Sequence, residues 1–491
     1  MGKRKKRFAI TLVSMMVVSL FLSACGGGGS DAGSAGEGDE PVELIWYTIG
    51  TPQKDVDRVM EEVSNYTKEK INATVTMKMV DWGDYTQKMQ VNVASGEPMD
   101  ILFTASGGFD YVQNARKGAF LELDSLIEDY GQDLKNTIDP AFLEGSKVDG
   151  HNYGIPANKE LPQQEVWRFN QTYLDKYNLD ISNVRSLESL EPLLKVIKEN
   201  EPSVTPFAMD KNHVPYVPYD YIIQNLPMAV KLDTTDYKIV NILETPEMQA
   251  ALKTMNEYFK AGYISPEAAT TGSTSNLTTS GNWFTDRAQT QPLADNLWSA
   301  SYGYPVVSTP ASDAIITNTS VQGSIMAISA NSAYPEKAME FLNLLNTDPV
   351  LRNMVDAGIE GVHYEKIDDN RIKNLPDYKN YDMPSYSLGN NMLLYLNEND
   401  ADDKWDQFKQ FNEQGVRSPI LGFNFDSSNV SSELAAVQNV KEQFWASLMT
   451  GSLDPEENIP KVIEKFEEAG LDKVMAEAQT QLDAWRAENG K

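Results

Sequence analysis

Cys25 has the most distinctive chemical setting in the sequence, because it is the only cysteine among 491 residues. A lone thiol cannot form a disulfide within its own chain, so we expect another covalent role for it. It follows an uncharged stretch, residues 8–22, and five cations stand within the first seven residues. The fifteen residues of this stretch extend about 22 Å as a helix, short of the roughly 30 Å hydrocarbon core of a bilayer. The pattern therefore predicts a secretory signal and not a permanent membrane helix.

The residues Leu22-Ser23-Ala24-Cys25 resemble the lipobox of bacterial lipoproteins, in which small residues precede a lipidated cysteine. The resemblance implies that residues 1–24 are removed and that Cys25 carries a lipid. Residues 25–40 are rich in Gly, Ser, Ala and acidic residues, a composition that behaves as a flexible tether with a reach of roughly 20 Å. We therefore expect a lipid anchor in a cell membrane, with the folded part on the extracytoplasmic face.

The other residues that could do chemistry do not form a known catalytic or metal-binding pattern. The sequence contains no Gly-x-Ser-x-Gly, His-Glu-x-x-His or Gly-x-x-x-x-Gly-Lys-Ser/Thr motif. His151, His213 and His363 lack the spacing of metal ligands, and residues 400–403 lack the Gly and distal Glu of a calcium loop. We predict that the protein is not an enzyme and holds no metal or cofactor. Its 71 acidic residues nevertheless allow many carboxylate pairs of the kind that glycosidases use.

The composition favours a folded, acidic, extracellular protein. Its hydrophobic fraction of 41% and aromatic fraction of 10% are typical of globular domains. The formal net charge is −29, and removal of the signal with its five cations makes it −34. This acidity argues against nucleic acid as a partner and against a protein lying flat on anionic lipid. No stretch after residue 22 approaches 18 consecutive apolar residues, so we expect no further membrane span.

The elements that must position a site follow a regular order after residue 41. The periodicity predicts strands at 42–48, 73–82 and 99–104, separated by helices at 53–70 and 84–94. Alternating strands and helices indicate βαβ units around a parallel sheet. Because ligands bind beyond the carboxyl ends of such strands, three segments are candidates for a site: 48–51, 82–85 and 104–109.

The second half of the chain has fewer periodic runs. Residues 190–309 are rich in Pro, Tyr and Thr and show few long patterns. The clearer signals predict strands at 166–170 and 323–329 and helices at 335–345, 433–449, 459–469 and 471–485.

Two segments resemble the hinge crossings of the extracellular solute-binding proteins of carbohydrate importers. Gly154-Ile155-Pro156 followed by Trp167-Arg168-Phe169-Asn170 resembles the first crossing, and residues 323–342 resemble the return crossing with its Ala-Ile-Ser strand and Pro-Glu-x-Ala helix. Residues 95–101 resemble the Gly-x-x-Pro-Asp-Ile turn of the family, although Pro98 stands one place early. Residues 358–364 and 418–423 resemble a lipoprotein branch with an added C-terminal domain.

The resemblance implies an α/β fold of the two-lobe, periplasmic-binding-protein-like type (type II), with a hinge between the lobes and a helical C-terminal region. The domains expected from it are lobe 1 at 41–158 plus 322–385, lobe 2 at 159–321, and a mainly helical region at 386–491 packed on the lobes.

The candidate ligand-binding residues combine flat aromatic rings with groups that donate and accept hydrogen bonds, as sugar sites require. Gly281-Asn282-Trp283 resembles the Asn-Gly-Pro-Trp turn of maltose-binding protein, which implies that Trp283 stacks on a ligand. Tyr216 and Tyr219 stand where that protein carries a Glu-Pro-Tyr contact. The remaining candidates come from the strand ends, the first crossing and the C-terminal part: Trp46, Trp82, Thr104, Glu160, Gln163 and Tyr386.

The function expected from the resemblance is capture of a solute, an oligosaccharide, between the two lobes and its delivery to ABC permease subunits. A monomer without nucleic-acid partners is expected. Two alternatives stay open at this point: a ligand-sensing or adhesive surface lipoprotein, and a surface carbohydrate-active enzyme. Peptides or polyols would use a similar aromatic cleft.

Overall fold

The computed structural model describes residues 40–491. The predicted signal peptide, Cys25 and all of the tether except Glu40 lie outside the described residues. Residues from Pro41 to Lys491 form one compact unit. Across this described part of the chain, no helix is both long and apolar enough to cross a membrane.

The first sheet has the strand order β2-β1-β3-β15-β6. β1 (Val42–Ile49) lies parallel to β2 (Ala73–Val80) and to β3 (Ile101–Thr104), which confirms the predicted parallel pairing. β15 (Ile325–Ile328) then runs antiparallel to β3, and β6 (Gly154–Pro156) runs antiparallel to β15. The sheet is therefore mixed. Its last two strands, β15 and β6, belong to the two segments that resemble hinge crossings.

Helices cover this sheet as the periodicity predicts. α1 (Val56–Ile71) buries Val59, Met60 and Val63 on one face. The core beneath it also contains α13 (Pro335–Thr347), whose Phe341 ring lies edge-on to Trp46 at a centroid distance of 5.6 Å. Further helices around this sheet are α2 (Tyr85–Ser95), α3 (Tyr111–Arg116), α4 (Asp124–Tyr130), α5 (Gln132–Thr137), α6 (Pro140–Gly145) and α14 (Pro349–Ala357).

The second sheet has the order β13-β7-β12-β8. β7 (Gln164–Asn170) is antiparallel to both β12 (Trp283–Thr290) and β13 (Val306–Pro310), whereas β8 (Thr205–Phe207) is parallel to β12. A smaller antiparallel sheet of β9 (Tyr219–Tyr221), β10 (Met228–Lys231) and β11 (Ile239–Asn241) lies nearby. The many short strands explain why this stretch shows few periodic runs. Helices of this part are α7 (Gln171–Tyr177), α8 (Glu191–Asn200), α9 (Pro246–Lys260), α10 (Ser275–Ser280) and α11 (Ala294–Tyr302).

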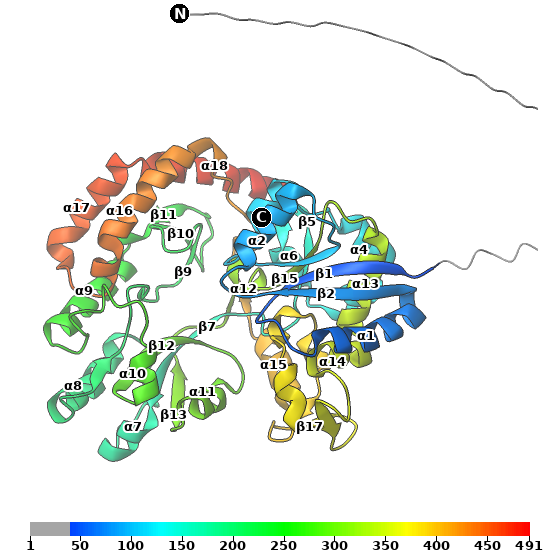
Figure 1. The fold of residues 1–491 in the computed structure, drawn as a ribbon. Helices are drawn as coiled ribbons and strands as arrows, with labels where there is room; N and C mark the ends of the chain where they lie inside the picture. The colour runs from blue at the N-terminus through cyan, green and yellow to red at the C-terminus, as the bar shows by residue number, and fades with distance from the viewer. Residues whose placement is uncertain (1–39) are drawn as a thin grey trace, which may run out of the picture. The chain divides into compact units, whose positions relative to one another are not determined.

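The C-terminal helices share a core with the second sheet. α16 (Ser431–Met449), α17 (Pro455–Glu468) and α18 (Leu471–Asn489) confirm the predicted helices to within about four residues. Trp445 and Phe466 belong to the same buried cluster as Phe207 and Phe284 of the second sheet. Figure 1 shows these helices, coloured orange to red, beside α9, β10 and β11.

Three segments carry the chain between the surroundings of the two sheets: residues 157–163, 311–324 and 414–430. The first two exchange a pair of 2.8 Å backbone hydrogen bonds between Gln163 and Ile315. β14 (Ile315–Ile316) pairs in turn with β19 (Val416–Arg417) of the third segment. The crossings are thus hydrogen-bonded side by side.

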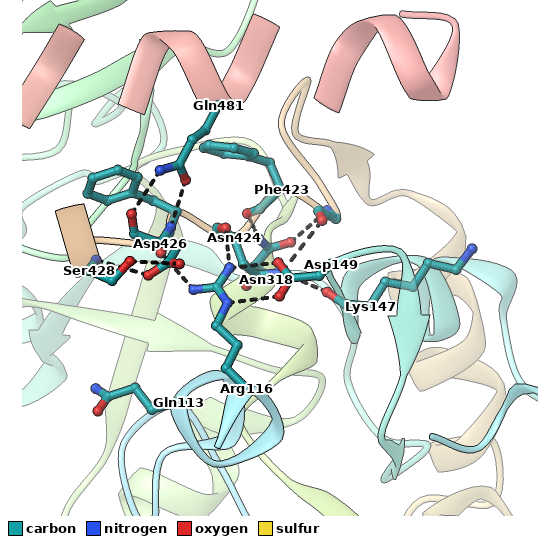
Figure 2. A network of polar contacts seen from close by, with 12 residues as sticks. Gln113, Arg116, Lys147, Asp149, Asn318, Phe423, Asn424, Asp426, Ser428 and Gln481 are labelled. Carbon is teal, nitrogen blue, oxygen red and sulfur yellow. Dashed lines mark hydrogen bonds and ion pairs between the residues drawn. The ribbon is translucent and has the colours of Figure 1, made fainter. Parts of the chain in front are cut away.

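Arg116, at the end of α3, attaches the third crossing to the surroundings of the first sheet (Figure 2). Its guanidinium donates to the carbonyl oxygens of Asn424 at 2.7 Å and Phe425 at 3.1 Å. The same group forms a bidentate pair with the Asp149 carboxylate at 3.0 and 2.9 Å. Five donors in a planar fork allow arginine to hold a carboxylate and two carbonyls at once.

Gln481 of α18 holds the next residue of the third crossing. Its side-chain oxygen accepts from the Asp426 N–H at 2.9 Å, and its amide nitrogen donates to the Asp426 carbonyl at 2.8 Å. The Phe423 ring of the same crossing also contacts Trp485 of α18, with a centroid distance of 5.8 Å. The contacts to the first-sheet side and to the C-terminal helices therefore overlap along residues 423–426.

Candidate ligand-binding site

Three cavities adjoin one another, and the first has walls from the surroundings of both sheets, whereas the other two are lined by the first two crossings and by second-sheet elements. Cavity A, of about 760 Å³, is bounded by Leu297 of α11 on one side and by residues from α14 to α15 (Lys404–Glu413) on the other. Cavity B, of about 390 Å³, shares Lys159, Glu160 and Leu297 with cavity A. Cavity C, of about 260 Å³, shares Gln163 and Gln289 with cavity B. Together the cavities form a continuous series.

The wall of cavity A is rich in aromatic and amide side chains, among them Tyr378, Tyr395, Trp405 and Asn391. Fully buried Arg352 fixes this wall from behind, because it donates to the Asn391 side chain and to the Ser385 carbonyl, each at 2.9 Å. Aromatic faces with amides at their edges suit a ligand that has apolar C–H faces and a rim of hydroxyl groups.

Trp82 and Tyr386 form an exposed aromatic pair. Trp82 follows the carboxyl end of β2, and Tyr386 lines cavity A. Their rings stack with a centroid distance of 6.3 Å and an interplanar angle of 22°. Trp82 is 46% and Tyr386 40% exposed, which is unusual for rings of this size. The pair is a ready surface for stacking.

Glu160 and Gln163 lie on the first crossing, as the resemblance implies. Glu160 lines cavities A and B, and its carboxylate pairs with Lys159 at 2.5 Å. Gln163 lines cavities B and C. The crossing thus places one carboxylate and one amide along the series.

Tyr216 and Tyr219 line cavity C together with Asp220 and Arg287. Burial is the main cause that raises the pKa of the Tyr216 phenol, and the Tyr219 hydroxyl donates to Glu247 at 3.2 Å. Burial also raises the pKa of Asp220 to about 6, although the Ser418 hydroxyl donates to this carboxylate at 2.5 Å. Cavity C is therefore polar and partly withdrawn from solvent.

Four predicted residues line none of the three cavities: exposed Trp82, which only stacks on Tyr386, and three residues that the structure buries completely. Trp46 packs in the core of the first sheet, and the Thr104 hydroxyl donates to the Phe109 carbonyl. Trp283 packs against Ala208 and Val306, and its indole N–H donates to Tyr304 at 2.6 Å. Alternate residues of a strand face opposite sides, so nearness to a strand end does not decide whether a ring faces a cleft.

Sequence analysis did not find Leu297 and Trp298, which α11 presents to the cavities. Leu297 lines A and B and is 56% exposed, and Trp298 lines B. The Arg168 guanidinium lies 4.8 Å from the centre of the Trp298 ring and 5.3 Å from that of Trp283. Trp283 therefore lies behind the wall that Trp298 forms. The adjacent apolar pair after Asp295 and Asn296 was the available signal.

Two other features lie apart from the series. A cavity of about 680 Å³ follows the carboxyl end of β3 and is lined by residues such as Ser106 and Asp110, within the predicted segment 104–109 and beside it. Elsewhere, the His151 ring contacts Asp124 at 2.8 Å and Glu122 at 3.2 Å. Sequence spacing did not reveal this trio, because His151 lies 27 residues after Asp124 and only folding brings it to the two carboxylates.

The family profile described as "bacterial extracellular solute-binding protein" matches residues 50–350. A second profile, a domain of unknown function, matches residues 419–487, which include most of α16 to α18. A carbohydrate ABC transporter substrate-binding protein of Streptococcus pneumoniae serotype 4 is 37% identical over 490 residues, 98% of each chain.

Solved structures agree with these matches. A crystal structure of the N-glycan transport solute binding protein NgtS from Streptococcus pneumoniae is 36% identical, covers 92% of this chain and 100% of its own, and has a TM-score of 0.84. Its complexes with Man5GlcNAc and Man1GlcNAc cover 92% and 90% of this chain and 99% of their own, with TM-scores of 0.70 and 0.73. The chain belongs to the bacterial extracellular solute-binding protein family and has that family's mixed α/β fold with an added helical C-terminal region.

Proposed function

We propose that this protein is the substrate-binding component of an ABC importer, which captures an oligosaccharide in cavities A, B and C and presents it to permease subunits. The series of cavities is the observation that carries the proposal. One small cavity would suit a single sugar, whereas three adjoining cavities of about 760, 390 and 260 Å³ give room for a chain of sugar units. The carbohydrate relatives and the glycan complexes of NgtS support this ligand class.

The saccharide is proposed to contact both aromatic rings and polar side chains. Trp82 and Tyr386 stack on sugar faces, while the polar groups that bind hydroxyls are Glu160, Gln163, Tyr216 and Tyr219. Leu297 and Trp298 complete the opposite wall. Trp46, Thr104 and Trp283 are not among the proposed contacts, since each is fully buried.

We further propose that closure of two lobes completes the site. Lobe 1 comprises 41–158 and 322–413, because residues up to α15 line cavity A from the first-sheet side, and lobe 2 comprises 159–321 with the helices from 431 onward. The TM-score to one NgtS structure, 0.84, exceeds those to its glycan complexes, 0.70 and 0.73, which supports a change of arrangement on binding. A ligand that touches both lobes stabilises the closed form by its extra contacts there.

The proposed location is the extracytoplasmic face of the cell membrane, with a lipid on Cys25. The family is extracellular, and the lipobox-like residues before the only cysteine support the anchor. A tether between the lipid and the folded part keeps the captured solute near a permease in the same membrane.

A thermal-shift measurement on residues 40–491 with Man5GlcNAc, Man1GlcNAc, other saccharides and peptides tests the function. A saccharide at about 100 times its dissociation constant should stabilise the protein by roughly 2.7 kcal/mol. Trp82→Ala and Tyr386→Ala should each weaken saccharide binding by about tenfold, because each removes one stacking face. Tyr130→Ala is the matched control: that ring is 38% exposed on α4 and lines none of the three cavities.

Two outcomes would contradict the proposal. A shift with peptides and with no saccharide would make the ligand class wrong. Full saccharide affinity in both aromatic variants would place the ligand away from cavity A.

A further inference from the structure

Every cation that lines cavities A, B and C within the described chain is already paired with a carboxylate. Lys159 pairs with Glu160 at 2.5 Å, Arg287 with Glu165 at 3.2 Å, and Lys404 with Asp400 at 2.9 Å. The charged side chains of these pairs are between 14% and 24% exposed. Solvent ions screen such half-buried pairs less than surface pairs, so an anionic ligand that approaches one of these cations also meets the carboxylate already paired with it.

Carboxylates also outnumber cations along the same walls. The three cations stand against six carboxylates: Glu160, Glu165, Asp220, Asp356, Asp382 and Asp400. The net charge of the chain, −29, has the same sign. A ligand that enters the series therefore meets a negative surface without an unpaired positive group.

Charged and uncharged sugars would behave differently at this surface. A hydroxyl group both donates and accepts, so it can bind a carboxylate and an ammonium group without separating them. A sugar carboxylate accepts only, so to reach one of these cations it must displace the protein carboxylate or share the cation with it at short range, where the two negative charges repel. Specific sites commonly exclude competitors by such repulsion.

We infer that the site selects uncharged saccharides and rejects those that carry a carboxylate, such as uronic or sialic acids. This selectivity rests on the proposed function, since it describes the ligand of the same cavities. The three ion pairs act as hydrogen-bonding groups for hydroxyls and as a barrier to anions.

Calorimetry with Man5GlcNAc and with the same glycan oxidised to carboxylates at its terminal C6 alcohols tests the inference. The oxidised glycan should bind at least about tenfold more weakly, because like charges at close range oppose binding. Equal affinity for the two forms, or binding of carboxylated saccharides alone, would overturn the selectivity and leave oligosaccharide capture standing. Failure of every saccharide, charged or not, would instead overturn the proposed function.

Replacing the paired carboxylates with uncharged amides tests whether the ion pairs cause the selectivity. Glu160→Gln frees Lys159, and Glu165→Gln frees Arg287, so each should bring the affinities for the two glycans about tenfold closer together. Glu457→Gln is the matched control: it makes the same change in net charge, but its partner Lys461, at 2.7 Å, lies on the exposed face of α17. In Glu457→Gln, the ratio of the affinities for the two glycans should stay unchanged. An equal change in all three variants would show that net charge, and not pairing, sets the selectivity.

Discussion

At the scale of single residues, Trp82 and Trp283 show how differently two tryptophans of one chain can be used. Trp82 is 46% exposed and stacks on Tyr386, whereas Trp283 is fully buried and donates its N–H to Tyr304. Trp82 was a candidate because it lies near a strand end, and Trp283 because Gly281-Asn282-Trp283 resembles a binding turn of maltose-binding protein. The distinction depends on partners that come from distant segments, so residue type alone could not make it.

Asp220 gives a prediction about pH. Its pKa in the folded protein is about 6, above its ordinary value of 3.8, so the folded state binds more protons than the unfolded state between these values. The contribution of Asp220 to the free energy of unfolding is therefore largest below pH 4, and it is lost as the pH rises through 6. Asp220→Asn should equal the parent near pH 4 and exceed it by about 1–3 kcal/mol at pH 7, measured by denaturant unfolding at each pH.

Asp236→Asn is the control for this measurement, because hydrogen bonds from Thr234 and from the Lys238 N–H lower the pKa of Asp236. Its effect should have the opposite sign, with a loss of stability at pH 7 relative to low pH. An Asp220→Asn difference that does not grow with pH would contradict the prediction.

At the scale of elements, the C-terminal helices share a buried core with the second sheet. Trp445, Phe466 and Val474 lie in one core with Phe284 of β12. The sequence predicts these helices well, because each has its own apolar periodicity. It did not show which sheet they cover, since an amphipathic face specifies burial but not the partner.

The Arg116 attachment predicts how firmly the third crossing is held. Arg116→Lys keeps the charge but loses the planar fork, so it should cost about 1–3 kcal/mol and speed amide hydrogen exchange in residues 422–426. Exchange by mass spectrometry and denaturant unfolding measure both effects.

Arg371→Lys provides the comparison for Arg116→Lys. Arg371 makes the same kind of contacts, to the carbonyls of Asn397 and Asp400 and to the Asp402 carboxylate, but in a different part of the fold. Arg371→Lys should lower the free energy of unfolding, but amide hydrogen exchange in residues 422–426 should be no faster than in the parent. If exchange in that segment is the same in parent and Arg116→Lys, Arg116 does not hold the crossing.

At the scale of the whole molecule, location and capture are coupled by the proposed tether. The acidic folded part, in a chain of net charge −29, has no electrostatic reason to stay on anionic lipid, so anchoring would depend on the lipid proposed for Cys25. Cys25→Ser should therefore move the protein from the membrane fraction to the medium, with unchanged saccharide affinity, as seen by fractionation and immunoblotting.

Ser30→Ala, a change within the tether, serves as the control and should leave the protein in the membrane fraction. Retention of Cys25→Ser at the membrane would show that another group anchors it.

The sequence by itself determined the order and type of most elements, the expected export signal and the resemblance to a solute-binding family. These are local properties: strand and helix periodicity, small residues before a lone cysteine, and short motifs in a fixed order. Only the tertiary structure decided which side chains meet, as in the stack of Trp82 on Tyr386, the burial of Trp46 and Trp283, and the ion pairs along the cavities. Those contacts join segments far apart in the chain, and their geometry follows from how whole elements pack rather than from any local pattern.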